Sequence, residues 1–439
     1  MKKKIRSLLP ESLKKRLRKI KVVYVNYFIK KKLSKKMRVK HQELIAEVKS
    51  KDKIKVVFLV IQHSAWKVDS VFKEMQNDPL FEPVILVCPF ITYGEERMMD
   101  DLNKTYDFFK RKGYPVVSSL KNSEAPYDWL EMKELQPDLI LFTNPHNLTR
   151  PEYYSDAYMN YLTCYIPYHH EVGLYGGNEE QYNQDIHNAF WMIFVPHQCS
   201  KDTYKKYCAS KDRNVLVTGY PACEELYSKR TEKVWKPQES KKMKIIWAPH
   251  HTIENKVLPY SNFLEYADLF IELIKNNKDN VQWAFKPHPI LKSNLYLHPK
   301  WGKKRTDLYY QLWAESSNTQ LEEGGYTELF QQSDAMIHDS GSFLAEYIYL
   351  KKPVLYTVRT KNYKSYYNDF GLSALASIKV AENESDIINF VDRLLSNEEK
   401  ITSEHHRFIE SNIAPFFGET TPSKVIINLI KSKLQHNER

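Results

Sequence analysis

The chain has little glycine and cysteine, and it has no long apolar run. Only 12 of its 439 residues are glycine, which argues against a low-complexity polymer. Its five cysteines form no C-x-x-C pair, so we expect reduced, buried thiols in a cytoplasmic protein, without zinc or an iron–sulfur cluster. The apolar stretch at residues 22–29 is interrupted by Tyr and Asn and is far shorter than the roughly 20 apolar residues of a membrane-spanning helix. It also lacks the small-residue cleavage site of a signal peptide.

Several nucleotide and metal motifs are missing as well. There is no G-x-G-x-x-G fingerprint and no Walker-type loop, which argues against dehydrogenases and NTPases. No D-x-D pair stands at an expected strand end, so we expect no metal and no cofactor. No nucleic-acid-reading module accompanies the basic residues, so nucleic acid is not an expected partner.

The positive charge is concentrated at the N-terminus. Residues 1–50 contain 18 Lys and Arg against three acids, a local charge of +15, so the net charge of +11 leaves −4 for the remaining residues. Apolar residues recur there at three- and four-residue steps: Ile5, Leu8, Leu9, Leu13, Leu17 and Ile20. This spacing predicts one apolar face, and with it a basic amphipathic helix after Pro10. Such a helix suits an anionic membrane surface, and a merely solvated helix is the alternative. We expect this arm to be removable without unfolding the rest.

Beyond residue 53 the chain alternates between strand-like and helix-like segments. Buried strands are predicted at 54–61, 84–89, 116–118, 139–143, 163–166, 192–195 and 215–218, and again at 245–248, 281–285, 335–337 and 354–357. Helices are predicted at 66–77, 95–112, 127–136, 179–190, 263–276, 384–395 and 423–434. This alternation predicts an α/β protein with two Rossmann-like domains and mostly parallel sheets. The expected parts are the arm (1–50), a first domain (53–228), a charged linker (229–244), a second domain (245–396) and C-terminal helices (397–439).

Polar residues follow two strands of the second series. Lys286 and His288 stand at the end of the strand in FKPHP, where the prolines on either side of His288 stiffen the backbone. His250 and His251 follow the strand that ends in PHH. Ligands of open α/β sheets bind outside the carboxyl ends of strands. A single histidine is usually structural. The clustering of three histidines and a lysine at strand ends instead favours a phosphorylated, nucleotide-linked ligand.

The most informative stretch is HDSGSFLAEYIYLKKPVLY, from His338 to Tyr356. A strand stops at a turn of Ser340, Gly341 and Ser342, and a helix begins at once, so its unpaired N–H groups face the turn. This arrangement predicts a phosphate cradle, although an ordinary turn capped by serine is the alternative. Glu346, one helical turn further on, suits a ribose diol.

Together, PxH after a strand, K-x-HP, and D-x-S-G followed by a helix and KKPV resemble the CDP-glycerol glycerophosphotransferase family of teichoic-acid and capsular-polymer enzymes. The resemblance implies the GT-B arrangement of two Rossmann-like domains, a first domain for the acceptor and a second for CDP-glycerol or another CDP-polyol. It also implies a lipid-linked acceptor, no cofactor and a peripheral position at the cytoplasmic face of a bacterial membrane. The donor would meet Lys286, His288 and the turn, with Glu346 on the ribose and His250 and His251 nearby.

A further family histidine, usually in W-H-G-T, would activate the acceptor hydroxyl. Here PYHHEVG occupies that place, so His170 is the expected general base and His169 the fallback. The departure from W-H-G-T leaves two other functions open: a nucleotide-sugar enzyme, either a glycosyltransferase or a UDP-N-acetylglucosamine 2-epimerase relative, and a non-catalytic membrane-associated nucleotide-binding protein.

Overall fold

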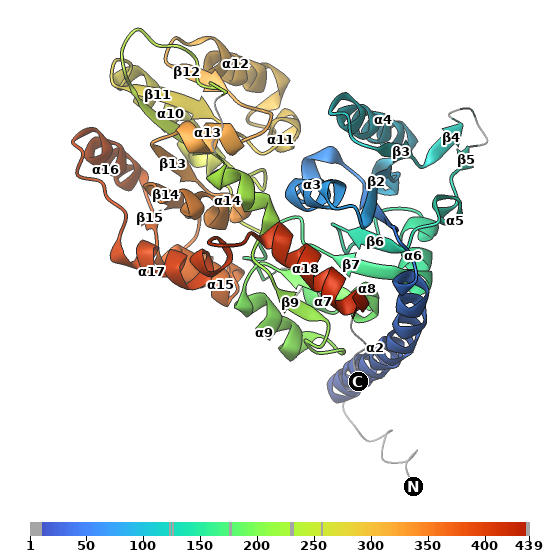
Figure 1. Ribbon diagram of the computed structural model, residues 1–439. Coiled ribbons are helices and arrows are strands. Elements are labelled where there is room, and N and C mark those ends of the chain that lie inside the picture. Colours follow the sequence, from blue (N-terminus) through green and yellow to red (C-terminus); the bar gives the residue numbers. More distant parts are fainter. Residues whose placement is uncertain are drawn as a thin grey trace. The chain divides into compact units, whose positions relative to one another are not determined.

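A computed structural model describes residues 11–122, 124, 127–174, 178–228, 232–255 and 258–435, which divide into two compact units (Figure 1). Unit 1 holds the described residues up to Tyr168, those from 178 to Thr218, and the C-terminal residues from Ser423. Unit 2 holds residues 169–174 and the described residues of Gly219–Pro422. Within the described residues, no helix is both long enough and apolar enough to span a membrane.

Unit 1 is built on a parallel sheet of seven strands in the order β3-β2-β1-β6-β7-β8-β9. These are β1 (Ile54–Val60), β2 (Phe81–Val87), β3 (Val116–Ser118), β6 (Leu139–Phe142), β7 (Leu162–Tyr165), β8 (Met192–Val195) and β9 (Val215–Val217). The seven predicted strands are all present, because runs such as VVFLV are buried on both faces. A two-stranded hairpin, β4 (Leu120–Asn122) and β5 (Asp128–Trp129), lies outside this sheet. It replaces the first half of the helix predicted at 127–136, which was wrong there.

Helices cover both faces of the unit 1 sheet, and each face has its own apolar core. The helices of the unit are α2 (Glu11–Lys49), α3 (Asp69–Asn77), α4 (Glu95–Arg111), α5 (Met132–Leu135), α6 (Ser155–Asn160), α7 (Glu179–Tyr182), α8 (Asp185–Ala189), α9 (Gln198–Tyr207) and α18 (Pro422–Gln435). The C-terminal helix α18 adds Ile426, Ile427 and Ile430 to the core that contains Phe58 and Leu141. It therefore belongs structurally to unit 1, although it follows unit 2 in sequence.

Helix α2 confirms the helical N-terminal region, but only part of it is an arm. Met37, His41 and Val48 are 1%, 6% and 4% exposed, and they recur on one face of the helix. Met37 joins one core of unit 1 and Val48 the other. Deleting residues 1–50 would therefore remove core side chains, so a deletion that spares the fold has to stop before this packed half.

Unit 2 contains a second parallel sheet, with six strands in the order β12-β11-β10-β13-β14-β15. The strands are β10 (Met243–Ala248), β11 (Val281–Phe285), β12 (Thr319–Leu321), β13 (Ala335–His338), β14 (Val354–Thr357) and β15 (Lys379–Ala381). The four predicted strands lie at the centre, and the two that the sequence did not reveal, β12 and β15, are three-residue edge strands. In local numbering this order is 3-2-1-4-5-6, the doubly wound Rossmann arrangement.

The core of unit 2 is rich in aromatic side chains. Trp247, Phe270 and Trp283 pack between the sheet and α10, and the Trp247 and Phe270 rings stack at 3.9 Å. The helices of the unit are α10 (Phe263–Asn276), α11 (Leu291–Leu297), α12 (Gly302–Glu315), α13 (Thr327–Gln332), α14 (Gly341–Glu346), α15 (Asp369–Ala376), α16 (Glu384–Leu395) and α17 (Ser403–Asn412). Trp235, ahead of β10, is 6% exposed and donates its ring N–H to the Leu329 carbonyl (3.3 Å), so the chain ahead of β10 packs on this unit.

Buried histidines should make unit 1 sensitive to acid. Burial lowers the pKa of His41 to about 4 and that of His187 to about 3. Both rings stay neutral in the folded state while the unfolded chain takes up protons below pH 6.5, so the stability that they contribute is present above pH 6.5 and is lost as the pH falls towards 4. Each contributes at most about 1.4 kcal/mol per pH unit.

We expect the melting temperature to fall steadily between pH 6.5 and 4.5, and His41→Leu to show a weaker dependence. The exposed His406 provides the control, since His406→Leu should change nothing. A melting temperature that stays constant over this range would contradict the expectation.

Candidate functional site

The strand order of unit 2 brings the three sequence motifs to one edge of its sheet. β11, β10 and β13 are neighbours, so the residues after their carboxyl ends lie side by side. The direction of winding reverses between β10 and β13, and ligands of doubly wound sheets bind outside such a switch point. Lys286 and His288 follow β11, His250 and His251 follow β10, and Ser340 follows β13.

Backbone hydrogen bonds tie these strand ends together. The buried carboxylate of Asp339 accepts the backbone N–H groups of His250 and of Asn262, the latter at 2.6 Å. The His288 N–H donates to the Pro249 carbonyl at 3.1 Å. Burial raises the pKa of Asp339 to about 7, and the donated N–H groups oppose that rise. Asp339 therefore holds the loop after β10 in place against the end of β13.

Three imidazoles meet at this edge. The ring centroid of His251 lies 4.2 Å from that of His250 and 4.0 Å from that of His288. The centroids of His250 and His288 are 5.0 Å apart. All three side chains are partly exposed. Burial lowers the pKa of His251 to about 4 and that of His288 to about 3. The cluster is thus neutral near pH 7 and can reach a ligand.

Lys286 supplies the cation of the site. It is 6% exposed, and its Nζ donates to the Gly324 carbonyl at 2.8 Å. Burial raises the pKa of the neighbouring Glu322, while a hydrogen bond from Gln320 and the charge of Lys286 work against this rise. Lys286 is therefore held at the tip of β11 by the loop that follows β12.

The Ser340–Gly341–Ser342 turn leads directly into α14, as predicted. The Ser340 N–H donates to Nδ1 of His338 at 3.2 Å, and Ser342 is half-buried. Gly341 is buried, and a Cβ added there would lie 3.5 Å from both Tyr260 and Val172. α14 has six residues and continues into a 3-10 turn, so it is shorter than the pattern suggested.

Glu346 lies in the interior of unit 2. It is 2% exposed, and its carboxylate accepts a hydrogen bond from the Tyr326 hydroxyl. Burial and this neighbouring carboxylate raise the pKa of Tyr326 well above its usual range. Any contact of Glu346 with a ribose would therefore share the carboxylate with Tyr326.

The segment with the paired histidines belongs to unit 2, although it follows β7 in sequence. Asn368 N–H donates to the Val172 carbonyl (3.0 Å), and Leu174 N–H donates to the Tyr366 carbonyl (2.9 Å). A Cβ at Gly371 would come within 2.3 Å of the Val172 oxygen, so only glycine leaves room for this approach. With Val172 also beside Gly341, the segment lies against the serine–glycine turn.

The two histidines of this segment have different surroundings. His170 is 3% exposed, its ring lies 4.4 Å from Tyr220 and 5.7 Å from Phe370, and its Nε2 is 3.3 Å from the Tyr349 hydroxyl. Burial lowers the pKa of His170 to about 3. His169 is only half-buried. Of the pair, His169 is the more exposed histidine.

The part of the chain that carries these motifs also matches a known family. Residues 169–418, more than half of the chain, match the family described as CDP-glycerol:poly(glycerophosphate) glycerophosphotransferase. The chain belongs to this family. It is thus an enzyme of the CDP-glycerol glycerophosphotransferase type, as the motifs predicted. No curated protein matches the chain.

Solved structures with a similar fold support the two-Rossmann-domain, GT-B-like architecture. The wall teichoic acid polymerase TagF, soaked with CDPG, is 14% identical, with 94% of this chain and 98% of that chain covered and a TM-score of 0.55. The S. aureus MnaA–UDP structure is 16% identical, with 88% and 98% covered and a TM-score of 0.56. A UDP-GlcNAc 2-epimerase from Neisseria meningitidis bound to UDP-GlcNAc is 16% identical, with 87% and 100% covered and a TM-score of 0.51.

Three residues of this glycerophosphotransferase escaped the sequence analysis. Asp339 stands inside the main motif, where the sequence predicts only the end of a strand. The Asn262 amide donates to the Thr357 carbonyl at 3.1 Å and so links β14 to the Asp339 network. Tyr326, the partner of Glu346, lies 20 residues upstream of it and gave no pattern. A carboxylate directly after a buried strand was the one available signal, for Asp339.

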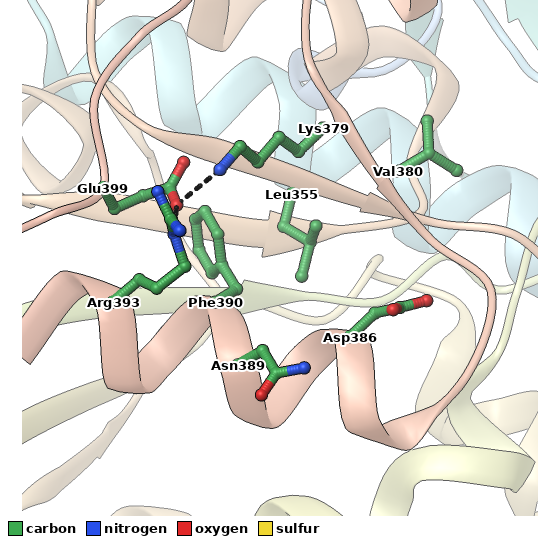
Figure 2. A pocket seen from close by; sticks show the side chains of 8 residues that line it. All are labelled: Leu355, Lys379, Val380, Asp386, Asn389, Phe390, Arg393 and Glu399. Carbon is green, nitrogen blue, oxygen red and sulfur yellow. Dashed lines mark hydrogen bonds and ion pairs between the residues drawn. The ribbon is translucent and has the colours of Figure 1, made fainter.

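A separate pocket of about 220 Å³ lies beside β14, β15 and α16 of this glycerophosphotransferase (Figure 2). Its charged residues neutralise one another, since Lys379 Nζ and Arg393 Nε lie 2.7 Å and 3.1 Å from the Glu399 carboxylate. It includes none of the residues of the three strand-end motifs. This pocket is therefore separate from the candidate site at the strand ends.

Proposed function

We propose that the protein transfers glycerol phosphate, or a related polyol phosphate, from a CDP-linked donor to a hydroxyl of a membrane-linked glycan or polyol-phosphate chain. The setting would be teichoic-acid or capsular polysaccharide synthesis at the cytoplasmic face of a bacterial membrane. The observation that carries the proposal is the meeting of the Lys286, His250 and Ser340 motifs at the switch point of unit 2, within the residues that match the family.

The donor pyrophosphate would lie at the strand ends, with Lys286 and the N–H groups of Gly341 and Ser342 near its oxygens. Fixed cations and N–H dipoles stabilise phosphate charge because they need no reorganisation when the charge develops. For Glu346 to receive the ribose hydroxyls, as the resemblance implies, the donor would have to reach a carboxylate that is 2% exposed and bonded to the Tyr326 hydroxyl. The TagF structure with CDPG and the MnaA structure with UDP support a nucleotide-linked donor at this kind of fold.

In the reaction, the acceptor oxygen attacks the phosphorus that carries the glycerol. The new O–P bond forms as the bond to the bridging oxygen breaks, and CMP leaves with the bridging oxygen and its charge. The acceptor hydroxyl gives its proton to a general base. Lys286 and His288 would stabilise the charge that grows on CMP.

We assign the base to His169 rather than His170. A general base needs access to the proton and a pKa near the working pH. The His170 ring lies among aromatic side chains, and its pKa of about 3 leaves it little proton affinity near neutral pH. His170 would instead hold residues 169–174 in place by packing against Tyr220 and Phe370.

A donor screen tests the proposed function. CDP-glycerol, CDP-ribitol and UDP-N-acetylglucosamine are each incubated with the protein and a lipid-linked acceptor. Acceptor-dependent release of CMP from a CDP-polyol is the expected result. Release of UDP would indicate a sugar transferase, conversion of UDP-N-acetylglucosamine into its epimer would indicate an epimerase, and no turnover with any donor would indicate a binding protein.

The exposed half of α2 supports the membrane part of the proposal. Tyr24, Val25, Phe28 and Ile29 are 63%, 45%, 61% and 57% exposed and share one helical face. Exposed Lys32 and Lys35 continue that face at helical spacing. An apolar stripe beside lysines suits the boundary between headgroups and acyl chains of an anionic bilayer.

Removing residues 1–29 should therefore release the protein from phosphatidylglycerol vesicles, because the stripe and most of the basic charge go with them. The packed half of α2 is kept, so the melting temperature should stay within a few degrees. Phe28→Asp should weaken binding in the full chain, whereas Leu297→Asp, at a residue 85% exposed in unit 2, should not. Vesicle sedimentation at low and high salt measures this, and salt should weaken the charged part of the binding. Undiminished binding of the shortened protein would contradict the membrane assignment.

A further inference from the structure

We propose that His250, His251 and His288 form a binding site for a divalent transition-metal ion of the Zn²⁺ or Co²⁺ type. One ring nitrogen from each residue can be chosen such that all three lie within 4.8 Å of one another. No family match assigns a metal to these residues, and the sequence motifs alone predicted none.

The three nitrogens lie within 4.8 Å of one another, and a bound ion would draw them closer together. With metal–nitrogen distances of 2.0–2.1 Å, three ligand nitrogens around a tetrahedral ion lie about 3.3 Å apart. Rotation of partly exposed imidazoles can bring the three nitrogens together. Three protein nitrogens also leave a position open for another ligand, as in metal sites that act on substrates.

The backbone holds the three histidines ready. The His250 N–H is bound to the Asp339 carboxylate, and the His288 N–H donates to the Pro249 carbonyl at 3.1 Å. His250 Nδ1 lies 2.9 Å from the Thr252 hydroxyl, which can accept a hydrogen bond from this nitrogen and leave Nε2 for an ion. His288 Nδ1 accepts the Ile290 N–H at 3.3 Å, so the His288 ring has to give up this bond when it coordinates an ion. His251 Nδ1 is buried and has no hydrogen-bond partner within the described residues.

The chemistry of the ligand set selects the ion. The cluster contains only imidazole nitrogen, which suits Zn²⁺, Co²⁺, Ni²⁺ or Cu²⁺, whereas Mg²⁺ and Ca²⁺ prefer oxygen.

This inference rests on the proposed function in one respect only: the open position of the ion would face a phosphate oxygen of the donor. The ion would then share the leaving-group charge with Lys286. Metal binding itself needs no donor and can be measured without turnover.

The test uses the untagged full-length protein, treated with EDTA and dialysed. Titration with Co²⁺, followed by visible absorption, should show one equivalent bound, and Zn²⁺ should displace it. His251→Ala and His288→Ala should each weaken binding about 100-fold or more. His406→Ala, at an exposed histidine of unit 2, should leave it unchanged. Melting curves check the fold, and the asparagine variants replace any alanine variant that melts early.

The proposed metal site would be wrong if the protein bound no Co²⁺, or if Co²⁺ binding were unchanged in both His251→Ala and His288→Ala. CDP-glycerol turnover, measured on the EDTA-treated protein both before and after Co²⁺ is added back, separates the two proposals. A protein that turns over CDP-glycerol but binds no Co²⁺ refutes the metal site and keeps the transferase. A protein that binds one Co²⁺ through these histidines without turning over any CDP-polyol keeps the site and refutes the transferase.

Discussion

Replacing His169 by alanine should lower the rate of polyol phosphate transfer by about 100-fold or more and leave CMP affinity unchanged. The acceptor hydroxyl cannot attack without losing its proton, and positioned general bases contribute 10²–10⁴-fold. His169 is the half-buried member of the pair, in a segment whose Val172 lies beside Gly341. Product formation is measured beside calorimetry with CMP, so loss of turnover can be separated from loss of nucleotide binding.

His170→Ala is the matched control for this experiment. Its ring fills a space beside Tyr220 and Phe370, so its removal should lower the melting temperature. Turnover measured well below the melting temperature should persist. Loss of turnover in His170→Ala at an unchanged melting temperature, together with an active His169→Ala, would show that His170, the base expected from the sequence, is the general base.

Replacing Lys286 by methionine should reduce kcat/KM for the CDP-polyol about 100- to 1,000-fold. Methionine keeps much of the apolar stem but removes the ammonium group at the tip of β11, where the proposed mechanism places the charge on departing CMP. Because stabilisation of that charge is strongest in the transition state, kcat should fall along with donor affinity. Steady-state kinetics with varied CDP-glycerol separate the two parameters.

Lys304→Met supplies the control, since Lys304 is an exposed lysine of α12 in the same unit. It should retain the activity of the unchanged protein. Equal activity of Lys286→Met and Lys304→Met would contradict the placement of the donor phosphates at the strand ends of unit 2.

The strands and the strand-end site were predictable because they depend on local patterns. Runs such as VQWAF in β11 are buried on both faces, and their apolar character indicates a central strand from the sequence alone. The three-residue edge strands β12 (TQL) and β15 (KVA) contain polar residues and do not stand out as apolar runs, whereas the equally short β3 (VVS) and β9 (VLV) do. Once the central strands are known, the residues that follow them must gather at one edge, which is why Lys286 and Ser340 could be named.

The remaining features depend on contacts between residues far apart in sequence. The packing of His41 and Met37 into unit 1 could not be read from the sequence of α2, because it depends on elements that lie far along the chain. Residues 169–174 join unit 2 through hydrogen bonds to residues about 190 positions later, such as that of Asn368 with Val172. The meeting of His251 with His288 likewise needs the adjacency of β10 and β11, which the motifs do not state.

The most direct test of the central claim is mass spectrometry of the product formed from CDP-glycerol and a lipid-linked acceptor, with CMP measured in the same reaction. The proposed function predicts an acceptor that gains one or more whole glycerol phosphate units, with one CMP released for each unit gained. An acceptor of unchanged mass in the presence of intact CDP-glycerol, or one that gains a sugar only when a UDP-sugar is supplied, would contradict it.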